Sequence, residues 1–304
     1  MAVDLTTRVG SVTLANPVMT ASGTAGHGTE LAPYGRLAAL GAHVVKSLSA
    51  EPWAGNKPPR VTESDAGMVN SVGLSGPGVE AWLEHELPAL RDAGATVVVS
   101  IWGRSVEGFA KAAAMLRGVG LPVVAVEVNV SCPNVEDRSR MFAHHPRATA
   151  EAVAASECGL PRWAKLSPNV PDVGEIAAAA LGAGAEGLTL VNTLLAMVVD
   201  PERRQAVLGA GGGGLSGPPL RPVATRAIAE CRRAFPGAAI VGVGGVAEGR
   251  HAAELLVAGA DAVQVGTATF RDPRAPWRVL EGLGRWCERH GVGAVGELVG
   301  SLRG

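Results

Sequence analysis

Short apolar segments recur along the chain, and each is separated from the next by a longer stretch whose apolar residues fall at helical spacing. Eight of the short segments are rich in Val and other apolar residues at consecutive positions, which is typical of buried strands. These predicted strands are residues 16–22, 43–49, 96–102, 123–131, 162–168, 187–193, 239–245 and 262–268. Predicted helices between them include residues 79–90, 106–118, 173–184, 222–234 and 249–259. This alternation predicts a parallel sheet.

The number of strand–helix units selects the fold. Eight units in 304 residues predict a single (β/α)8 TIM barrel over residues 1–304, and an open doubly wound sheet is the alternative that the same alternation permits. Two connections are too long for turns, at residues 50–78 and 194–219. Their content of Trp, Met, Val and Leu predicts lids or binding segments, although the glycine run 211–214 is expected to be mobile or tightly turned.

Composition narrows the class of partner. The chain is 47% hydrophobic and 18% charged with a formal net charge of −1, which gives no electrostatic reason to expect nucleic acid or an anionic membrane. We expect a soluble, cytoplasmic protein, because the sequence has neither a targeting segment nor an apolar run long enough to span a bilayer.

The four cysteines lie far apart in the sequence, and no two of them form a C-x-x-C pair. This spacing argues against a zinc site, an iron–sulfur cluster held by this chain alone, or disulfides. Cys158, Cys231 and Cys287 lie in predicted helices and are interpreted as buried, inert thiols.

Polar residues stand at the carboxyl ends of nearly all the predicted strands, which in a barrel converge on the face where active sites are built. Two of them, Lys46 and Lys165, are flanked by apolar residues, so we expect each ammonium to be partly desolvated unless an anion meets it. The alternative is a lysine that packs its stem on apolar surface and keeps its head in water, which is less expected for two lysines on one face.

The last two strands end in glycines, Gly244 and Gly245 in one and Gly266 in the other. Backbone N–H groups exposed there predict a phosphate cradle, although glycines also permit tight turns. Together, these strand ends predict a site for a phosphorylated planar cofactor and a polar substrate.

Cys132 lies in NVSCPN, residues 129–134, directly after the most apolar strand. A thiol at a strand mouth, close to amides and a cation, can act as a nucleophile or as a general base. A buried, inert cysteine is the alternative.

Six segments resemble, in order and spacing, the class 1 dihydroorotate dehydrogenases: NVSCPN, KLSPNV, GLTLVNTL, GGLSGP, VGVGGV and AGADAVQVGTA. The resemblance runs from about residue 14 to residue 273. NSVGLSGPGVE and NTLLAMVVD resemble the B type, which pairs with a separate electron-transfer subunit, more than the fumarate-using A type. The class 2 enzymes use a serine base, whereas the motif here holds Cys132.

The resemblance implies a barrel that binds FMN and oxidises (S)-dihydroorotate to orotate in pyrimidine (UMP) biosynthesis. Cys132 would remove the C5 proton while a hydride leaves C6 for the flavin, and Lys165 would stabilise negative charge on the reduced ring. The implied flavin-binding residues are Ser22, Lys46, Ser47, Ser100, Asn129, Lys165, Val191, Gly217, Gly244, Gly245, Gly266 and Thr267. The implied substrate-binding residues are Lys46, Asn70, Ser71, Val72, Gly73, Leu74, Asn129, Asn134, Asn192 and Thr193. No metal is implied.

The B-type resemblance also implies partners. One is a subunit that carries FAD and a [2Fe–2S] cluster and passes electrons to NAD, and another is a second copy of this chain in a homodimer.

Three departures from the family pattern leave other functions open. The lid Glu136 to His145 has Arg138-Ser139 in place of a Gly-Gly pair, Ser100 replaces an asparagine, and the NGTGG motif is missing before GGLSGP. We therefore expect a lid that folds or moves differently. A flavin-dependent paralogue acting on another dihydropyrimidine or cyclic amide is the main alternative. A non-catalytic FMN-binding barrel is disfavoured, since a scaffold needs neither the thiol nor the lysines.

Overall fold

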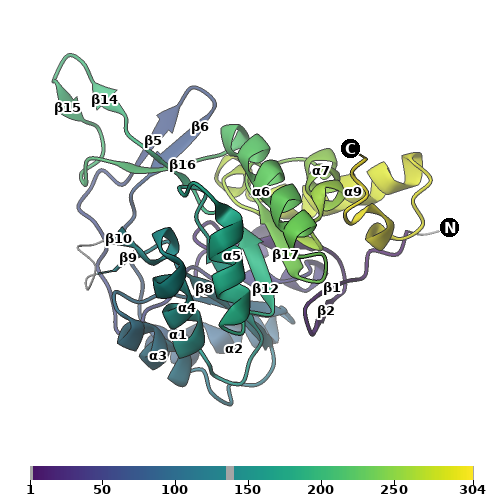
Figure 1. The fold of residues 1–304 in the computed structure, drawn as a ribbon, viewed down its shortest axis with the longest axis horizontal. Helices are drawn as coiled ribbons and strands as arrows, with labels where there is room; N and C mark the ends of the chain where they lie inside the picture. Colours follow the sequence, from purple (N-terminus) through teal and green to yellow (C-terminus); the bar gives the residue numbers. More distant parts are fainter. Residues whose placement is uncertain (1–2, 135–139, 304) are drawn as a thin grey trace.

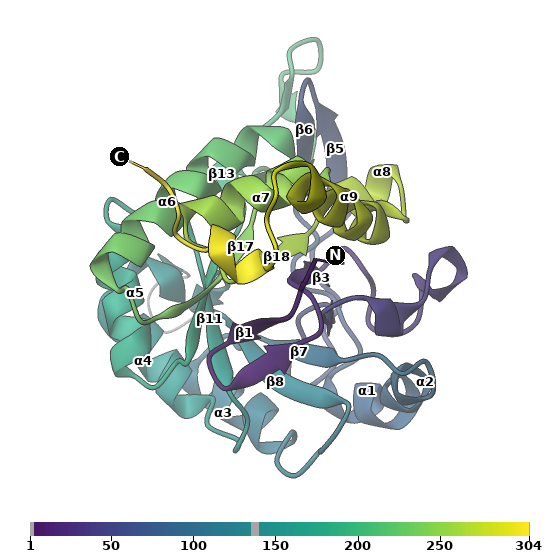
Figure 2. The same cartoon turned by 90° about the vertical axis from the view of Figure 1, so that its right-hand side faces the viewer.

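Eight parallel strands form a closed barrel in the computed structural model, which describes residues 3–134 and 140–303 (Figures 1 and 2). The strands are β3 (Val18–Thr20), β4 (His43–Val44), β7 (Val97–Ile101), β8 (Val123–Asn129), β11 (Arg162–Leu166), β12 (Gly187–Leu190), β17 (Ala239–Val243) and β18 (Ala262–Val265). They pair in this order, and β18 returns to β3. The Thr20 N–H donates to Ala42 O at 3.2 Å, which closes the ring between β3 and β4. The predicted (β/α)8 barrel is therefore confirmed, and the open sheet is excluded.

Helices surround the strands on the outside of the barrel (Figure 2). They are α1 (Val79–His85), α2 (Leu87–Asp92), α3 (Val106–Ala114), α4 (Pro146–Ala155), α5 (Val173–Gly182), α6 (Arg221–Ala234), α7 (Gly249–Ala258), α8 (Ala268–Arg271) and α9 (Ala275–Arg289). The predicted helix 79–90 is divided at Glu86, because Pro88 has no N–H to donate and its ring clashes with the carbonyl four residues earlier. Cys158 lies beyond the end of α4, so its placement in a helix was wrong, but its side chain is buried as expected.

The interior of the barrel has an apolar end. Strand alternation points Met19, Val44, Val98, Ala125 and Trp163 toward the barrel axis, where they form one buried cluster. The hairpin of β1 (Thr7–Val9) and β2 (Val12–Leu14) contributes to the same cluster and contacts β17 and β18. This hairpin closes the amino-terminal end of the barrel (Figure 2).

The two long connections pair with each other at the opposite end. Strands β5 (Val61–Ser64) and β6 (Gly67–Asn70) come from the first, and β13 (Leu194–Ala196) and β16 (Gly213–Ser216) from the second. They form one antiparallel sheet in the order β13-β16-β6-β5, and the hairpin of β14 (Val199–Asp200) and β15 (Gln205–Ala206) extends beyond it (Figure 1). We call this four-stranded sheet the roof.

The glycine run 211–214 lies partly in the roof, which corrects the expectation that it is all mobile or turned. Gly211 is in a turn with φ +84°, but Gly213 and Gly214 belong to β16. A Cβ at Gly213 would meet the carbonyl of Asn70, and one at Gly214 would meet the side chain of Thr193. Glycine is needed there because the backbones approach closely.

Shorter elements complete the chain. The 3₁₀ helices are η1 (Ala32–Tyr34), η2 (Leu37–Ala39), η4 (Phe142–His144), η5 (Pro218–Leu220) and η6 (Val295–Leu298). The predicted lid falls largely on residues 135–139, which lie outside the described residues; on either side, β9 (Pro133–Asn134) pairs with β10 (Arg140–Met141). Among the described residues, no helix is long and apolar enough to cross a bilayer.

Candidate active site

A cavity of about 380 Å³ lies between the carboxyl ends of the barrel strands and the roof. It brings together nearly all of the residues that the sequence assigned to a site. Those that line it are Ser22, Lys46, Ser47, Asn70, Ser71, Val72, Gly73, Leu74, Asn129, Lys165, Val191, Asn192, Thr193, Gly217, Gly244, Gly245, Gly266 and Thr267. Two of the predicted residues that the structure describes, Ser100 and Cys132, do not line it.

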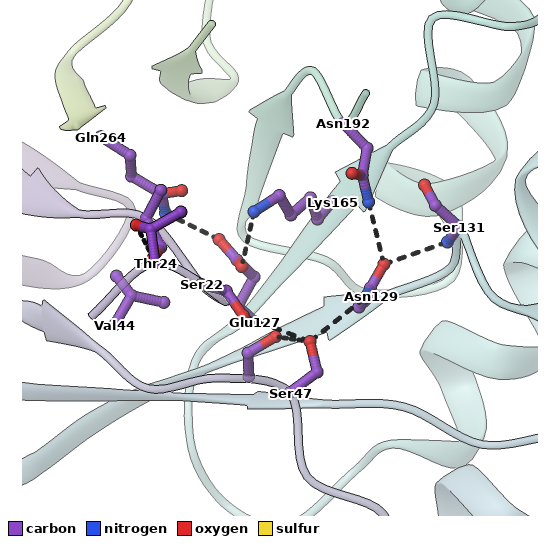
Figure 3. Close-up of polar contacts among 12 residues, drawn as sticks. Ser22, Thr24, Val44, Ser47, Glu127, Asn129, Ser131, Lys165, Asn192 and Gln264 are labelled. Atoms are coloured by element: carbon purple, nitrogen blue, oxygen red, sulfur yellow. Dashed lines mark hydrogen bonds and ion pairs between the residues drawn. The ribbon is translucent and has the colours of Figure 1, made fainter. Parts of the chain in front are cut away.

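Asn129 is the centre of a hydrogen-bonded chain along one wall (Figure 3). Its Nδ2 donates to Ser47 Oγ at 3.1 Å, and its Oδ1 accepts from Asn192 Nδ2 at 3.3 Å and from the Ser131 N–H at 3.2 Å. Behind Ser47 lies Ser100, whose hydroxyl is 2.8 Å from Ser47 Oγ. Ser100 is fully buried and hydrogen-bonds to Ser47 behind the cavity wall, so it does not itself line the cavity.

Lys46 occupies the mouth of β4 next to the first long connection. Its Nζ donates to the carbonyl oxygen of Ser75 and to Ser75 Oγ, the latter at 3.0 Å. Burial lowers the pKa of Lys46, and the nearby Arg60 guanidinium lowers it further. Half-buried cations at the edge of a cavity favour an anionic ligand, as the sequence predicted.

Lys165 faces a carboxylate that the sequence analysis missed. Its Nζ is 3.4 Å from Oε1 of Glu127, and Gln264 Nε2 donates to Oε2 of the same carboxylate at 2.7 Å (Figure 3). Glu127 is fully buried, and Lys165 is 5% exposed. The signal was present in the sequence, because Glu127 interrupts an apolar strand and by alternation faces the same side as Asn129.

Glycines bring the end of β17 against η5 and α6. Gly244 and Gly245 have φ of +145° and +65°, and a Cβ on them would lie 2.9 Å from Ala224 Cβ and 2.8 Å from Arg221 Cβ. Gly217 also has a positive φ, +99°. Residues with side chains fit none of these positions, so the wall is bare backbone, which suits a phosphate.

Cys132 is turned away from the cavity. Its Sγ donates toward Gly103 O at 3.1 Å and Asn129 O at 3.3 Å, and the side chain has no solvent exposure. Burial raises the pKa of this thiol to about 12, so it is neutral at physiological pH. This conformation therefore disfavours the thiolate that a general base would require, and the role of Cys132 as base stays a prediction. The side chain of Asn134 lies outside the described residues.

Two asparagines that the sequence analysis did not single out organise the loops of the site. Asn169 Nδ2 donates to Thr193 O at 2.9 Å, and its Oδ1 accepts from the Leu195 N–H at 2.9 Å. Asn56 Nδ2 donates to Ser71 Oγ at 2.9 Å. Both line the cavity. Their positions in the sequence could have identified them as site residues, since Asn169 ends the KLSPN segment at a strand end and Asn56 lies in the first long connection.

Comparison with known proteins gives a consistent result. A family model described as "Dihydroorotate dehydrogenase" matches residues 4–286. The chain is 47% identical over 303 residues to the catalytic subunit of dihydroorotate dehydrogenase B (NAD(+)) from Desulforudis audaxviator, covering 99% of this chain and 98% of that one. It is 42% identical over 301 residues to the subunit of the same description from Geobacter sp. strain M21, covering 98% of each. It is also 44% identical over 306 residues to a "Putative dihydroorotate dehydrogenase A (fumarate)" from Solibacter usitatus, covering 100% of each.

The matched family is generally flavin-dependent, and a cavity with a glycine-lined wall and two lysines fits such a cofactor. The B-type relatives are named as catalytic subunits, which implies that those proteins work with a partner subunit. The resemblance seen in the six sequence segments is confirmed over the full length. The chain belongs to the dihydroorotate dehydrogenase family.

Proposed function

We propose that the cavity oxidises (S)-dihydroorotate to orotate with FMN as the hydride acceptor, in pyrimidine (UMP) biosynthesis. The observation that carries this proposal is the convergence of Lys46, Lys165 and five asparagines on one cavity with a bare glycine wall. Cations, amide donors and a phosphate cradle are the groups that a carboxylated pyrimidine and a phosphorylated flavin require.

FMN would lie across the strand ends with its phosphate at the glycine wall. The residues that would hold it are Ser22, Lys46, Ser47, Asn129, Lys165, Val191, Gly217, Gly244, Gly245, Gly266 and Thr267, with Ser100 acting through Ser47. When bound, FMN accepts the hydride that leaves C6 of the substrate. Lys165 would supply fixed positive charge beside the ring that receives it.

The substrate would lie between the flavin and the roof. Lys46 would pair with its carboxylate, and Asn70, Asn129, Asn192 and Thr193 would hydrogen-bond the ring, with the backbone of Ser71 to Leu74 closing one side. Asn134 is assigned to the same set by the sequence motif. The half-buried Lys46 ammonium supports this pairing because a carboxylate would restore the solvation that burial removes.

Cys132 would take the C5 proton. Loss of that proton to Sγ and of the C6 hydride to the flavin leaves the C5=C6 double bond of orotate. A neutral thiol is not a base, so Cys132 would first release its proton to water and turn from Gly103 O toward the cavity when substrate is bound. Its sequence neighbour Ser131 already lines the cavity, so Cys132 lies next to the cavity along the chain.

The chain would act as the catalytic subunit of a B-type enzyme in the cytoplasm, as a homodimer with an electron-transfer subunit carrying FAD and a [2Fe–2S] cluster. The relatives named as catalytic subunits support the partner. The four cysteines of the chain are free and separated, which suits a reducing compartment and leaves the iron–sulfur cluster to the partner.

The test is anaerobic reduction of the purified chain. The protein should carry a yellow flavin, and dihydroorotate should bleach its visible band within the time of mixing. Dihydrouracil, which lacks the carboxylate, is the matched control and should bleach it far more slowly. A flavin that stays yellow with dihydroorotate but is bleached by another dihydropyrimidine would contradict this substrate and favour the paralogue.

A further inference from the structure

The polar layer of the barrel lies directly beneath the cavity and above the apolar end. Glu127 lies at its centre on β8, two residues before Asn129, and does not line the cavity. Strand register places Glu127 beside Trp163 and Asn129 beside Lys165, so Lys165 reaches diagonally down to the carboxylate. Gln264 reaches the same carboxylate from β18, which is four strands away around the barrel. One side chain thereby links two walls (Figure 3).

This arrangement does little for stability alone. Removing a carboxylate and an ammonium from water costs free energy that their attraction restores only in part, and an uncharged pair of similar size often serves a fold equally well. Two further buried atoms of the layer, Gln264 Oε1 and Thr189 Oγ1, have no hydrogen-bond partner among the described residues. The layer is therefore built around the charge of Lys165 rather than for internal hydrogen bonding.

We propose that Glu127 is a positioning residue for Lys165, and that its charge tunes how readily the cofactor of the proposed function is reduced. This inference rests on that function. Glu127 directs the ammonium from below and offsets part of its positive charge. Without the carboxylate, the Lys165 charge acts uncompensated on the reduced ring, so reduction becomes more favourable.

The first experiment measures the midpoint potential of the bound flavin in Glu127→Gln, which keeps the size of the side chain and removes its charge. We expect the ratio of reduced to oxidised flavin at a fixed potential to rise at least tenfold, about 30 mV for a two-electron couple. Glu186→Gln is the matched control, because Glu186 accepts hydrogen bonds from Ser11 at the amino-terminal end of the barrel. Its potential should equal that of the wild type. An unchanged or lower potential in Glu127→Gln would overturn the inference.

The second experiment needs no flavin and tests the pairing itself. Lys165→Met leaves the Glu127 charge buried without its partner. Urea unfolding of the flavin-free variant should therefore show a much smaller equilibrium constant for folding than the wild type. Adding Glu127→Gln to Lys165→Met should raise the equilibrium constant for folding at least tenfold, since the pair is then neutral. The double variant also keeps the test available if one single variant does not fold. Effects that simply add would overturn the inference.

The two proposals fail differently. Failure of the proposed function is read on the wild-type chain, as a protein whose flavin dihydroorotate does not bleach. Failure of the inference is read on the variants, as an unshifted potential or as additive unfolding effects. A wild-type chain that binds no flavin would overturn both.

Discussion

The two ends of the barrel interior are built from the same strands but have opposite chemistry. At the amino-terminal end, Met19, Val44, Val98 and Trp163 pack with the β1–β2 hairpin into a closed apolar cluster. At the carboxyl end, the residues two positions further along three of these strands are Lys46, Ser100 and Lys165. Lys46 and Lys165 line the cavity, and Ser100 supports its wall through Ser47. The barrel therefore separates its tasks along the axis, with packing at one end and binding at the other.

The sharpest way to test this separation is to remove the proposed base at the binding end. Cys132→Ala should lower kcat by about 10²- to 10⁴-fold, the usual contribution of a general base. Steady-state assay with dihydroorotate and a dye acceptor measures the effect, with flavin content as a check on folding. Cys231→Ala is the control, because Cys231 is a buried thiol in α6 away from the cavity. Wild-type kcat in Cys132→Ala would rule out Cys132 as the base.

A large-to-small change at the packing end should act on stability instead. Trp163 is fully buried in the apolar cluster, so Trp163→Ala should lower the free energy of unfolding by about 3–5 kcal/mol. Urea unfolding of the flavin-free chain measures it. Leu121→Ala, at a side chain that is 77% exposed, should change it by less than about 0.5 kcal/mol. If Trp163→Ala instead impaired substrate binding at unchanged stability, the separation of tasks would be wrong.

A histidine in the barrel wall should make stability depend on pH. Burial lowers the pKa of His43 from 6.5 to about 4. Below pH 6.5 the unfolded chain takes up a proton that the folded chain does not, so stability is full above pH 6.5 and is lost as pH falls toward 4. The loss should be of order 2–3 kcal/mol.

Unfolding free energies at pH 7 and pH 4.5 measure this dependence. His43→Leu should reduce this dependence, whereas the exposed His85→Gln should leave it as in the wild type. An equal pH dependence in His43→Leu would assign the effect to other groups. Burial also lowers the pKa of His27 to about 4, so part of the dependence should remain in His43→Leu.

The smallest effect is expected from a residue behind the binding end. Ser100→Ala removes the hydroxyl that supports Ser47, and the loss of one hydrogen bond is worth about 1 kcal/mol, roughly a fivefold weaker FMN affinity. Fluorescence titration of the flavin-free chain with FMN measures it, and Ser11→Ala at the other end is the control. An unchanged affinity would leave Ser100 without a role in binding.

Strand alternation made much of the fold predictable from the sequence. Parallel strands in a barrel have one possible site face, so Lys46, Asn129, Lys165 and Asn192 could be assigned to one cavity from their positions alone. The break between α1 and α2 could also have been predicted from Pro88, although residues 79–90 were interpreted as one helix.

Contacts between distant segments could not be predicted in the same way. The pairing of β6 with β16 depends on tertiary approach, for which a single sequence holds no periodic signal. The direction of the Cys132 side chain, away from the cavity, depends on the carbonyl of Gly103, which is 29 residues earlier in the chain. Glu127 shows the reverse case, since its place in an apolar strand was visible and its partner Gln264 was not.

The roof also has a meaning for how the enzyme could change over evolution. Each connection pairs two of its own strands, β5 with β6 and β13 with β16, and the central ladder between β6 and β16 joins the two pairs. A two-stranded hairpin alone is only marginally stable, so each connection depends on the other. A chimera that takes one connection from a relative would lose the register of Val69 with Leu215, whereas one that takes both would keep it. Substrate preference in this fold would therefore be inherited as a pair of loops, which drift and transfer together.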